Sequence, residues 1–294
     1  MIERTYFQPE DLKQARSILA KHPDAAIVAG GTDLVVAARS GKSPLPASLI
    51  AIHSLRELSG IEANRAGVKI GALTTHGDLE ASDTIRRFWA ALSDAAALVG
   101  SPATRHLGSI GGNICNASPA MELGSPLLIF DATVELASSG RPRRVPFSSF
   151  VVGPGLNDAR PGELLTSVRL PALKVRGRAG SAYLRLEYRQ SMEIAIVGAA
   201  AMIAVDKRGR CTDARVALTA VAPTCVRAPG TEEMLRGKAI ESEVIERAAQ
   251  AASDSARPID DVRATADYRR AMVSVIVRRA LVKALERATA RHDS

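Results

Sequence analysis

Two glycine pairs constrain this chain more than any other feature of its sequence. Gly30-Gly31 lies within AAIVAGGTDLV (25–35), and Gly111-Gly112 lies within TRHLGSIGGNICNAS (104–118). Glycine adopts positive φ at little cost and lacks the Cβ that would keep a ligand away from the backbone. Successive N–H groups can then point into one concavity suited to phosphate oxygens. The two segments, about eighty residues apart, predict loops that close on a pyrophosphate from opposite sides, with simple tight turns as the alternative.

Other well-known site motifs are missing from the sequence. It contains neither the G-x-G-x-x-G dinucleotide fingerprint nor the G-x-x-x-x-G-K-[ST] phosphate loop, which argues against both classes of nucleotide site. The three cysteines are widely spaced without a C-x-x-C pair, and no H-E-x-x-H occurs among the histidines. The sequence therefore predicts no metal site and no iron–sulfur cluster on this chain.

Composition and charge narrow the class of protein further. The longest apolar stretch, residues 194–205, is too short to span a bilayer, and the N-terminal residues lack the apolar core of a signal peptide. We therefore expect a cytoplasmic protein without a membrane span. The net charge of +8 comes from basic residues interleaved with acidic ones, and aromatic residues are only 3% of the chain. This pattern does not predict a nucleic-acid surface.

The first half of the chain alternates short strands and helices. Strands are expected over 25–29 and 48–52 around a helix at 32–40, which makes a β-α-β unit with Gly30-Gly31 at the strand end. A strand at 67–73, a helix at 76–81 and one longer helix at 86–99 are expected next. A long polar loop then carries Gly111-Gly112, before an apolar helix at 120–130 and strands at 133–137 and 163–170.

The sequence of the second half predicts a separately folded domain. Strands near 181–189, 195–205 and 213–221 are followed by helices near 231–236, 241–254 and 264–290, which is typical of an α+β domain with an antiparallel sheet. The expected domains are 1–176, with subdomains of about 1–55 and 56–176, and 177–294. Basic residues between 269 and 291 are interpreted as the solvated face of the last helix, with Arg278, Arg279 and Arg287 facing solvent or an acidic neighbour.

Five motifs in order give the chain a family resemblance. They are AGGTDL (29–34), IGALTTHGDLEAS (70–82), SIGGNICNASPAMEL (109–123), YRQSMEIAIVGAA (188–200) and RPIDDVRATADYRRAMVSVIVRRAL (257–281). Through them the chain resembles the FAD-binding medium subunit of the molybdenum hydroxylases, the group of carbon monoxide dehydrogenase and xanthine dehydrogenase. The resemblance implies an α+β fold: a two-subdomain FAD-binding fold of the vanillyl-alcohol-oxidase type, followed by a C-terminal α+β domain with a small antiparallel sheet.

The resemblance also implies where FAD would bind. Glu122 stands where the family usually has Asp, and Arg185 stands where it usually has Lys and would keep a positive charge near the flavin. Leu165 and Ile194 would lie beside the flavin ring. No catalytic residue is expected on this chain, His76 and His106 are interpreted as structural, and Cys115 as a buried packing residue. The implied phosphate cradle comprises Ala29, Gly30, Gly31, Thr32, Asp33, Leu34, Ser109, Ile110, Gly111, Gly112 and Asn113.

The function implied by the resemblance is electron transfer within a heterotrimer. FAD on this chain would pass electrons from 2Fe-2S clusters of a small subunit to an external acceptor, and a large subunit would hold molybdopterin. Whether two heterotrimers associate, which substrate is oxidised and which acceptor is used remain open. Two alternatives are a self-sufficient FAD-dependent oxidoreductase of the same fold and a flavin-free assembly protein. The former would need an acid or base motif that the sequence lacks, and the intact glycine pairs argue against the latter.

Overall fold

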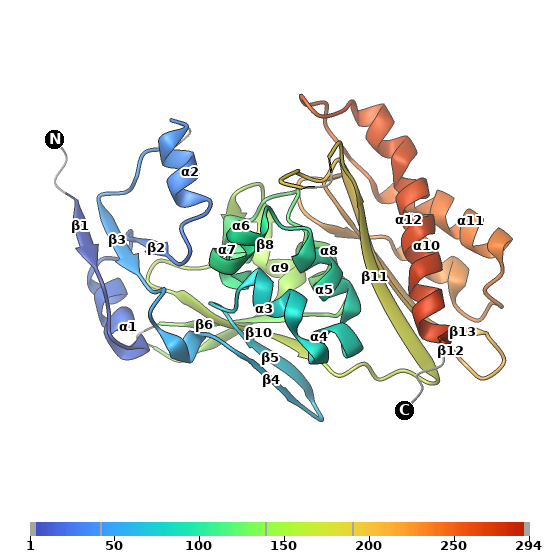
Figure 1. The fold of residues 1–294 in the computed structure, drawn as a ribbon, viewed down its shortest axis with the longest axis horizontal. Helices are drawn as coiled ribbons and strands as arrows, with labels where there is room; N and C mark the ends of the chain where they lie inside the picture. Colours follow the sequence, from blue (N-terminus) through green and yellow to red (C-terminus); the bar gives the residue numbers. More distant parts are fainter. Residues whose placement is uncertain (1–3, 42, 139, 190, 291–294) are drawn as a thin grey trace. The chain divides into compact units, whose positions relative to one another are not determined.

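The computed structural model describes residues 4–41, 43–138, 140–189 and 191–290, which form two compact units, each discontinuous in sequence (Figure 1). The first unit contains residues 1–78, 102–117 and 132–172, and the second contains residues 79–101, 118–131 and 173–294. Helix α3 (His76–Ala81) crosses the boundary between the two ranges. The chain therefore passes from one unit to the other several times before it enters the C-terminal sheet.

The first unit holds a parallel and an antiparallel sheet. Its elements are β1 (Thr5–Phe7), α1 (Leu12–Lys21), β2 (Ala26–Val28), α2 (Leu34–Arg39), β3 (Ser48–Ala51), η1 (Arg56–Leu58), β4 (Ile61–Asn64), β5 (Gly67–Gly71), α6 (Pro102–Leu107), α7 (Ile110–Asn116), β6 (Thr133–Ala137), β7 (Arg143–Pro146), α9 (Phe147–Phe150), β8 (Val151–Gly153), β9 (Leu156–Asn157) and β10 (Leu164–Pro171). The sheet orders are β1-β3-β2 and β4-β5-β10-β6-β7, with β8 and β9 paired separately. The predicted β-α-β unit is confirmed, because β2 and β3 pair in parallel.

A small apolar core supports the parallel sheet. Ala15 and Leu19 of α1 pack with Ile50 of β3 and with Leu55 and Leu58, which follow it. The helix begins cleanly because the Asp11 side chain accepts a hydrogen bond from the Gln14 N–H at 2.7 Å. This packing fixes the end of β2, and hence the position of the first glycine pair.

The second unit is a four-stranded antiparallel sheet between two layers of helices (Figure 1). Its elements are α4 (Asp83–Phe88), α5 (Ala90–Ala97), α8 (Gly124–Ile129), β11 (Arg178–Leu186), β12 (Val197–Val205), β13 (Cys211–Thr219), β14 (Val226–Arg227), α10 (Pro229–Leu235), α11 (Ser242–Ala251), η2 (Ala252–Ser255) and α12 (Ala266–Thr289). Every residue of β12 is buried because helices cover both faces of the sheet, and its sequence VGAAAMIAV is accordingly apolar without alternation. The predicted antiparallel C-terminal sheet is confirmed.

Two of the secondary-structure predictions for the middle of the chain are wrong. The helix expected over 86–99 is two helices, since the backbone leaves helical geometry at Trp89, whose indole is buried. The polar loop expected around Gly111-Gly112 is helix α7. The Ser109 hydroxyl caps that helix by accepting from the Gly112 N–H at 3.2 Å, and Ile110 and Ile114 are buried. Glycine pairs suggested a loop, but the serine cap and the two isoleucines favour a helical turn.

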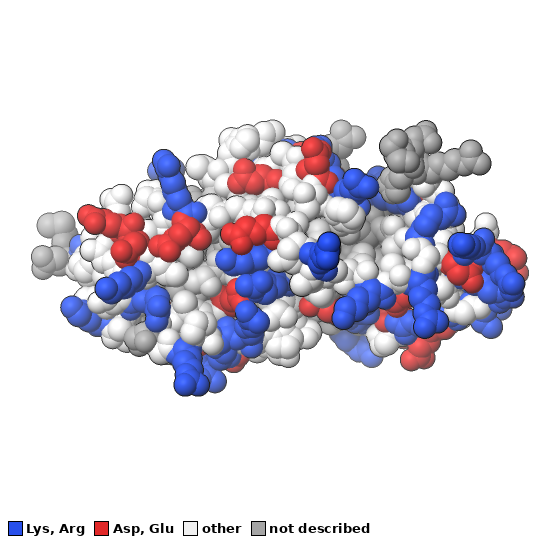
Figure 2. Space-filling view, turned by 90° about the horizontal axis from the view of Figure 1, so that it is seen from below, with Lys and Arg blue, Asp and Glu red and all other residues white. Residues whose placement is uncertain are grey.

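Only some of the basic residues of the C-terminal helix α12 are exposed to solvent. Arg279 is exposed, whereas Arg269 is buried and donates to the Ile196 and Ala220 carbonyls at 2.9 and 3.0 Å. Arg287 forms an ion pair with Asp94 of α5. The interpretation of this region as solvated is therefore wrong for Arg269, and Arg291 lies outside the described residues. Figure 2 shows Lys and Arg side chains interspersed with Asp and Glu on one face of the molecule.

Candidate functional site

The two glycine-bearing segments meet inside the first unit. A Cβ built on Gly30 would lie 1.9 Å from the carbonyl oxygen of Leu107, so the two backbones touch at this point. Farther along, the Asn116 amide donates a hydrogen bond to Asp33 at 3.2 Å. Leu107 and Asn116 were not predicted as site residues, because neither side chain carries a recognisable ligand-binding pattern in the sequence. The structure therefore brings 29–34 and 107–116 into direct contact.

Each glycine pair contains one packed and one open residue. The Gly30 Cβ position is filled by Leu107, and a Cβ on Gly111 would lie 2.7 Å from the Ala72 carbonyl oxygen. Gly31 has a φ of +69°, and a Cβ there would meet nothing closer than the Val35 side chain at 3.4 Å. A Cβ on Gly112 would meet only the Ser109 hydroxyl, at 3.3 Å. The open sides of the cradle are therefore at Gly31 and Gly112.

The hydrogen-bonding groups along the two segments are unequally satisfied. The Ile110 and Gly111 N–H groups donate to the Thr74 and Ala72 carbonyls at 3.0 and 2.8 Å, so they are committed to the fold. In the described part of the chain, the N–H groups of Gly31 and Thr32 make no backbone hydrogen bond. The Asn113 Oδ1 atom is buried and has no partner among the described residues. Free N–H donors and an orphaned acceptor fit a ligand with both phosphate oxygens and hydroxyl groups, as FAD has.

His76 lies buried against the second segment. Its backbone N–H donates a hydrogen bond to the Gly108 carbonyl at 3.0 Å, and its imidazole ring lies against Gly108. Burial, with a smaller contribution from the nearby Arg105 charge, lowers the pKa of His76 from 6.5 to about 4. The imidazole is therefore neutral at pH 7 and packs as an uncharged group. Cys115, by contrast, is exposed on α7, so the prediction of a buried packing residue is wrong.

Leu165 belongs to the first unit and is buried in β10. The pairing of β10 with β6 is irregular between Leu165 and Ser167, where one strand bulges. A bulge re-aims the side chains on either side of it. The apolar Leu165 side chain is thus held by the sheet itself rather than by a loop.

Glu122 and Arg185 form a buried ion pair in the second unit. The Arg185 guanidinium, 1% exposed, contacts the Glu122 carboxylate at 2.6 Å and also donates through Nε to Glu187 at 2.6 Å. Burial raises the pKa of Glu122 from 4.5 to about 7 in spite of the Arg185 charge. Two carboxylates therefore share one guanidinium. Ile194, in the same unit, is 43% exposed and is available for contact with a ligand or a partner.

The described residues contain no group of three or more His, Cys, Asp or Glu side chains arranged to hold a metal ion. Among the helices of the described ranges, none has the length and apolar character needed to cross a bilayer.

Two protein families match almost the whole chain. The family described as the FAD binding domain in molybdopterin dehydrogenase matches residues 2–173. The CO dehydrogenase flavoprotein C-terminal domain matches residues 182–284. The two matches follow each other without overlap and leave out only short segments.

Individual relatives are similar over their full length. The 6-hydroxypseudooxynicotine dehydrogenase complex subunit alpha of Paenarthrobacter nicotinovorans is 33% identical, over 98% of this chain and 97% of that protein. The carbon monoxide dehydrogenase medium chain of Hydrogenophaga pseudoflava is also 33% identical, over 94% of this chain and 95% of its own.

Solved structures agree with the sequence relatives. A chain of carbon monoxide dehydrogenase from Hydrogenophaga pseudoflava superimposes with a TM-score of 0.91 at 32% identity, covering 98% of this chain and 99% of that chain. A chain of quinoline 2-oxidoreductase from Pseudomonas putida 86 gives a TM-score of 0.90 at 28% identity and covers 98% of both chains.

Proposed function

Because the chain belongs to the FAD-binding subunits of the molybdopterin dehydrogenases, an oxidoreductase family, we propose that it is the electron-transfer subunit of a heterotrimeric molybdenum hydroxylase. Electrons would reach it from 2Fe-2S clusters of a small partner subunit, and a large partner subunit would hold molybdopterin. The relatives named as a complex subunit and as a medium chain support a multisubunit assembly.

The observation that carries the proposal is the cradle made by the two glycine segments. The free N–H groups of Gly31 and Thr32 would bind phosphate oxygens, and the open face of Gly112 would let the ligand approach the backbone. The orphaned Asn113 Oδ1 would accept a hydrogen bond from a hydroxyl group of the cofactor. When bound, FAD supplies a carrier that exchanges electrons singly or in pairs.

The other residues of the proposed site would orient the cofactor and adjust its surroundings. Leu165 offers an apolar surface that excludes water, and Ile194 offers a second one. Arg185 supplies a buried positive charge that Glu122 and Glu187 contact, and burial raises the pKa of Glu122. None of these side chains is proposed to exchange a proton with an organic substrate, and the proposal assigns no catalytic residue to the described part of the chain.

Purification with the partner subunits tests the assignment. We expect the wild-type chain to contain FAD and to co-purify with a molybdopterin subunit and a 2Fe-2S subunit. When the clusters are reduced chemically, an external acceptor should reoxidise them rapidly. A Gly112→Val complex should assemble, lack FAD and lose that fast reoxidation.

Two results would overturn the proposal. One is a flavin-free Gly112→Val complex that reoxidises its clusters at the wild-type rate. The other is a wild-type chain that purifies alone, binds FAD and oxidises an organic substrate without partners.

A further inference from the structure

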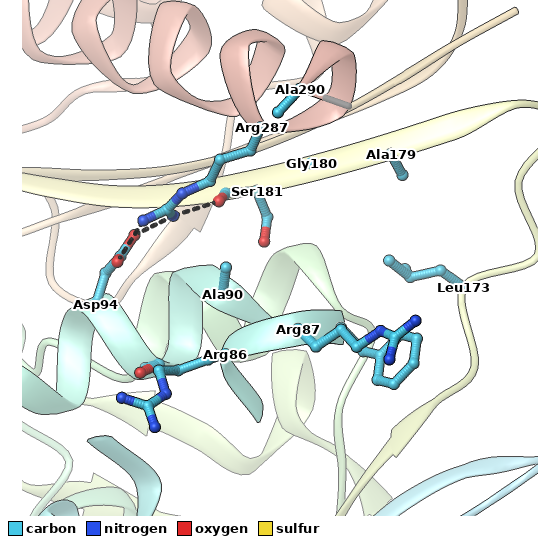
Figure 3. A pocket seen from close by; sticks show the side chains of 12 residues that line it. Arg86, Arg87, Ala90, Asp94, Leu173, Ala179, Gly180, Ser181, Arg287 and Ala290 are labelled. Atoms are coloured by element: carbon cyan, nitrogen blue, oxygen red, sulfur yellow. Dashed lines mark hydrogen bonds and ion pairs between the residues drawn. The ribbon is translucent and has the colours of Figure 1, made fainter. Parts of the chain in front are cut away.

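A second concave site lies within the second unit and contains no residue of the two glycine segments. It is a pocket of about 270 Å³ bounded by α4, α5, the start of β11 and the last turn of α12 (Figure 3). Glu122, Arg185 and Ile194 do not line it. The proposed FAD function therefore leaves this pocket without a role.

At one end of the pocket the charged side chains are already paired with each other. Asp94 and Arg287 meet there through two contacts, of 2.6 and 2.9 Å (Figure 3). Asp94 also accepts a hydrogen bond from the Tyr183 backbone N–H at 3.1 Å. The Ser181 hydroxyl oxygen, from the same strand as Tyr183, accepts the Ala91 N–H at 3.1 Å. At this wall of the pocket these groups are hydrogen-bonded to protein partners.

Arg87 is different because its charge has no carboxylate partner among the described residues. Its guanidinium lies over the Phe88 ring, 5.3 Å from the ring centroid. The neighbouring Arg86 is held by Asp83 at 2.8 Å and by the Ala81 carbonyl at 3.0 Å. Figure 3 shows the Arg87 side chain extending toward Leu173. One unpaired cation therefore stands beside an apolar part of the lining.

The apolar part of the pocket is unusually open to solvent. Phe88 is 54% exposed although it is a large aromatic residue, and the alanines 90, 179 and 290 line the same pocket as Leu173. An aromatic side chain exposed in a concave surface is typical of a ligand site. The volume of about 270 Å³ lies just below the roughly 300 Å³ at which pockets for drug-sized ligands begin, so it suits a smaller molecule.

We propose that this pocket binds a small monocarboxylate with an apolar or aromatic body. The carboxylate would pair with the Arg87 guanidinium, whose two parallel N–H groups match its geometry. The body of the ligand would pack on Phe88 and Leu173 and remove their surfaces from water. A single unpaired arginine balances one negative charge, which favours a carboxylate over a phosphate dianion.

Benzoate is a suitable probe, and ligand-observed NMR on the full-length purified chain is a suitable measurement. A ligand of this size is expected to bind with a Kd of about a millimolar. Benzamide has the same shape without the charge and should bind at least about tenfold more weakly, a loss typical of one charged hydrogen-bonded contact. Inorganic phosphate, which has charge without an apolar body, should compete poorly.

Variants distinguish binding of benzoate in this pocket from non-specific attraction of the anion to a positively charged protein. Arg87→Gln should weaken benzoate binding at least about tenfold, since it removes the cation that lines the pocket without a carboxylate partner among the described residues. Ala179→Leu should weaken it by filling the pocket. Arg279→Gln, at an exposed arginine of α12 outside the pocket, is the matched control and should bind as the wild type does. FAD content should not change in the Arg87 and Arg279 variants.

Three results would overturn the proposal. They are the absence of saturable benzoate binding, binding to Arg87→Gln as tight as to the wild type, and displacement of benzoate by phosphate as effective as by unlabelled benzoate. The Arg87 result is decisive even if Ala179→Leu fails to fold. Arg87 is an exposed residue of α4 and makes no buried contact with the described residues, so Arg87→Gln should fold.

Discussion

At the scale of single residues, the four glycines of the two pairs serve different purposes. Gly30 and Gly111 let backbone pass against backbone, with Cβ positions 1.9 and 2.7 Å from carbonyl oxygens. Gly31 and Gly112 have open sides. The sequence makes the pairs look alike, yet only one member of each is placed to face a ligand.

Substitutions at Gly111 and Gly112 distinguish a glycine needed for packing from a glycine needed for ligand binding. Gly112→Val should reduce FAD occupancy strongly while the chain stays folded, because the added methyl groups would occupy the open face. Gly111→Val should instead destabilise the first unit by about 3 kcal/mol, since the new Cβ would overlap the Ala72 carbonyl. Flavin absorbance and chemical denaturation measure the two effects. Full FAD occupancy in a folded Gly112→Val chain would show that the cradle is wrongly placed.

His76 should make the stability of the chain sensitive to acid. Its folded pKa of about 4 lies below the ordinary value of 6.5, so the unfolded state takes up a proton first as the pH falls. The stability that neutral His76 contributes is present above pH 6.5 and is lost as the pH falls toward 4, to an extent of about 3 kcal/mol. Denaturation between those pH values should show a shallower acid-dependent loss for His76→Gln than for the wild type. Equal slopes would mean that the pKa of His76 is the same in the folded and the unfolded state.

At the scale of elements, one glycine sets the distance between β11 and α12. A Cβ on Gly180 would lie 2.3 Å from the Ala284 carbonyl and 2.4 Å from the Ala288 nitrogen. Helix α12 therefore packs directly on the backbone of the strand. Gly230, in α10, offers a matched control because a Cβ there would meet nothing within 4 Å.

Alanine at these two glycines should have opposite effects. We expect Gly180→Ala to lower the free energy of unfolding by about 3 kcal/mol, because the helix must move away from the sheet. Gly230→Ala should leave it unchanged or raise it by up to about 1 kcal/mol through helix propensity. Thermal and denaturant unfolding of both variants provide the comparison, and a stable Gly180→Ala chain would contradict the close packing.

Arg287 joins three elements of the second unit. It projects from α12, pairs with Asp94 of α5 and donates to the Ser181 carbonyl of β11 at 2.6 Å. Because the contact is partly buried, Arg287→Gln should cost about 2 kcal/mol of stability. Arg279→Gln changes an exposed side chain of the same helix and should cost under about 0.5 kcal/mol. Equal losses in the two variants would show that the Asp94 pair contributes nothing.

At the scale of the whole molecule, the second unit depends on segments from the middle of the chain. Helices α5 and α8 pack on the face of the sheet opposite α12, although both precede β11 by many residues (Figure 1). All residues of α8 are buried. A fragment that begins at residue 177 lacks both helices and exposes one face of an apolar sheet.

We therefore expect the fragment 177–294 to form secondary structure without cooperative packing. Circular dichroism should show helix and strand, while a dye that binds exposed apolar surface should respond strongly and the thermal transition should broaden. The full chain should show a sharp transition and weak dye binding under the same conditions. A fragment that unfolds as sharply as the full chain would show that its sheet does not need α5 and α8.

The sequence by itself determined the local features whose causes are local. The buried strand at 197–205 and the alternation of β2, α2 and β3 could be predicted, because residue types along a short segment dictate them. The five motifs also determined the family, because their residues and their order can be read directly from the linear sequence. The break at Trp89 could not be predicted, because burial of its indole against distant segments decided it. The helix at Gly111-Gly112 was missed for a local reason, since the glycine pair suggested a loop and the Ser109 cap with Ile110 and Ile114 favoured a helix.

Only the tertiary structure decided which side of each residue is open. Gly30 and Gly111 pack against Leu107 and Ala72, Arg287 pairs with Asp94, and Arg185 pairs with Glu122, and each of these partners is distant in sequence. Likewise, the exposed Phe88 and the unpaired Arg87 become a pocket only when β11 and α12 pack beside α4. A sequence specifies which groups can bind, but desolvation and contact between distant segments determine which of them remain free to do so.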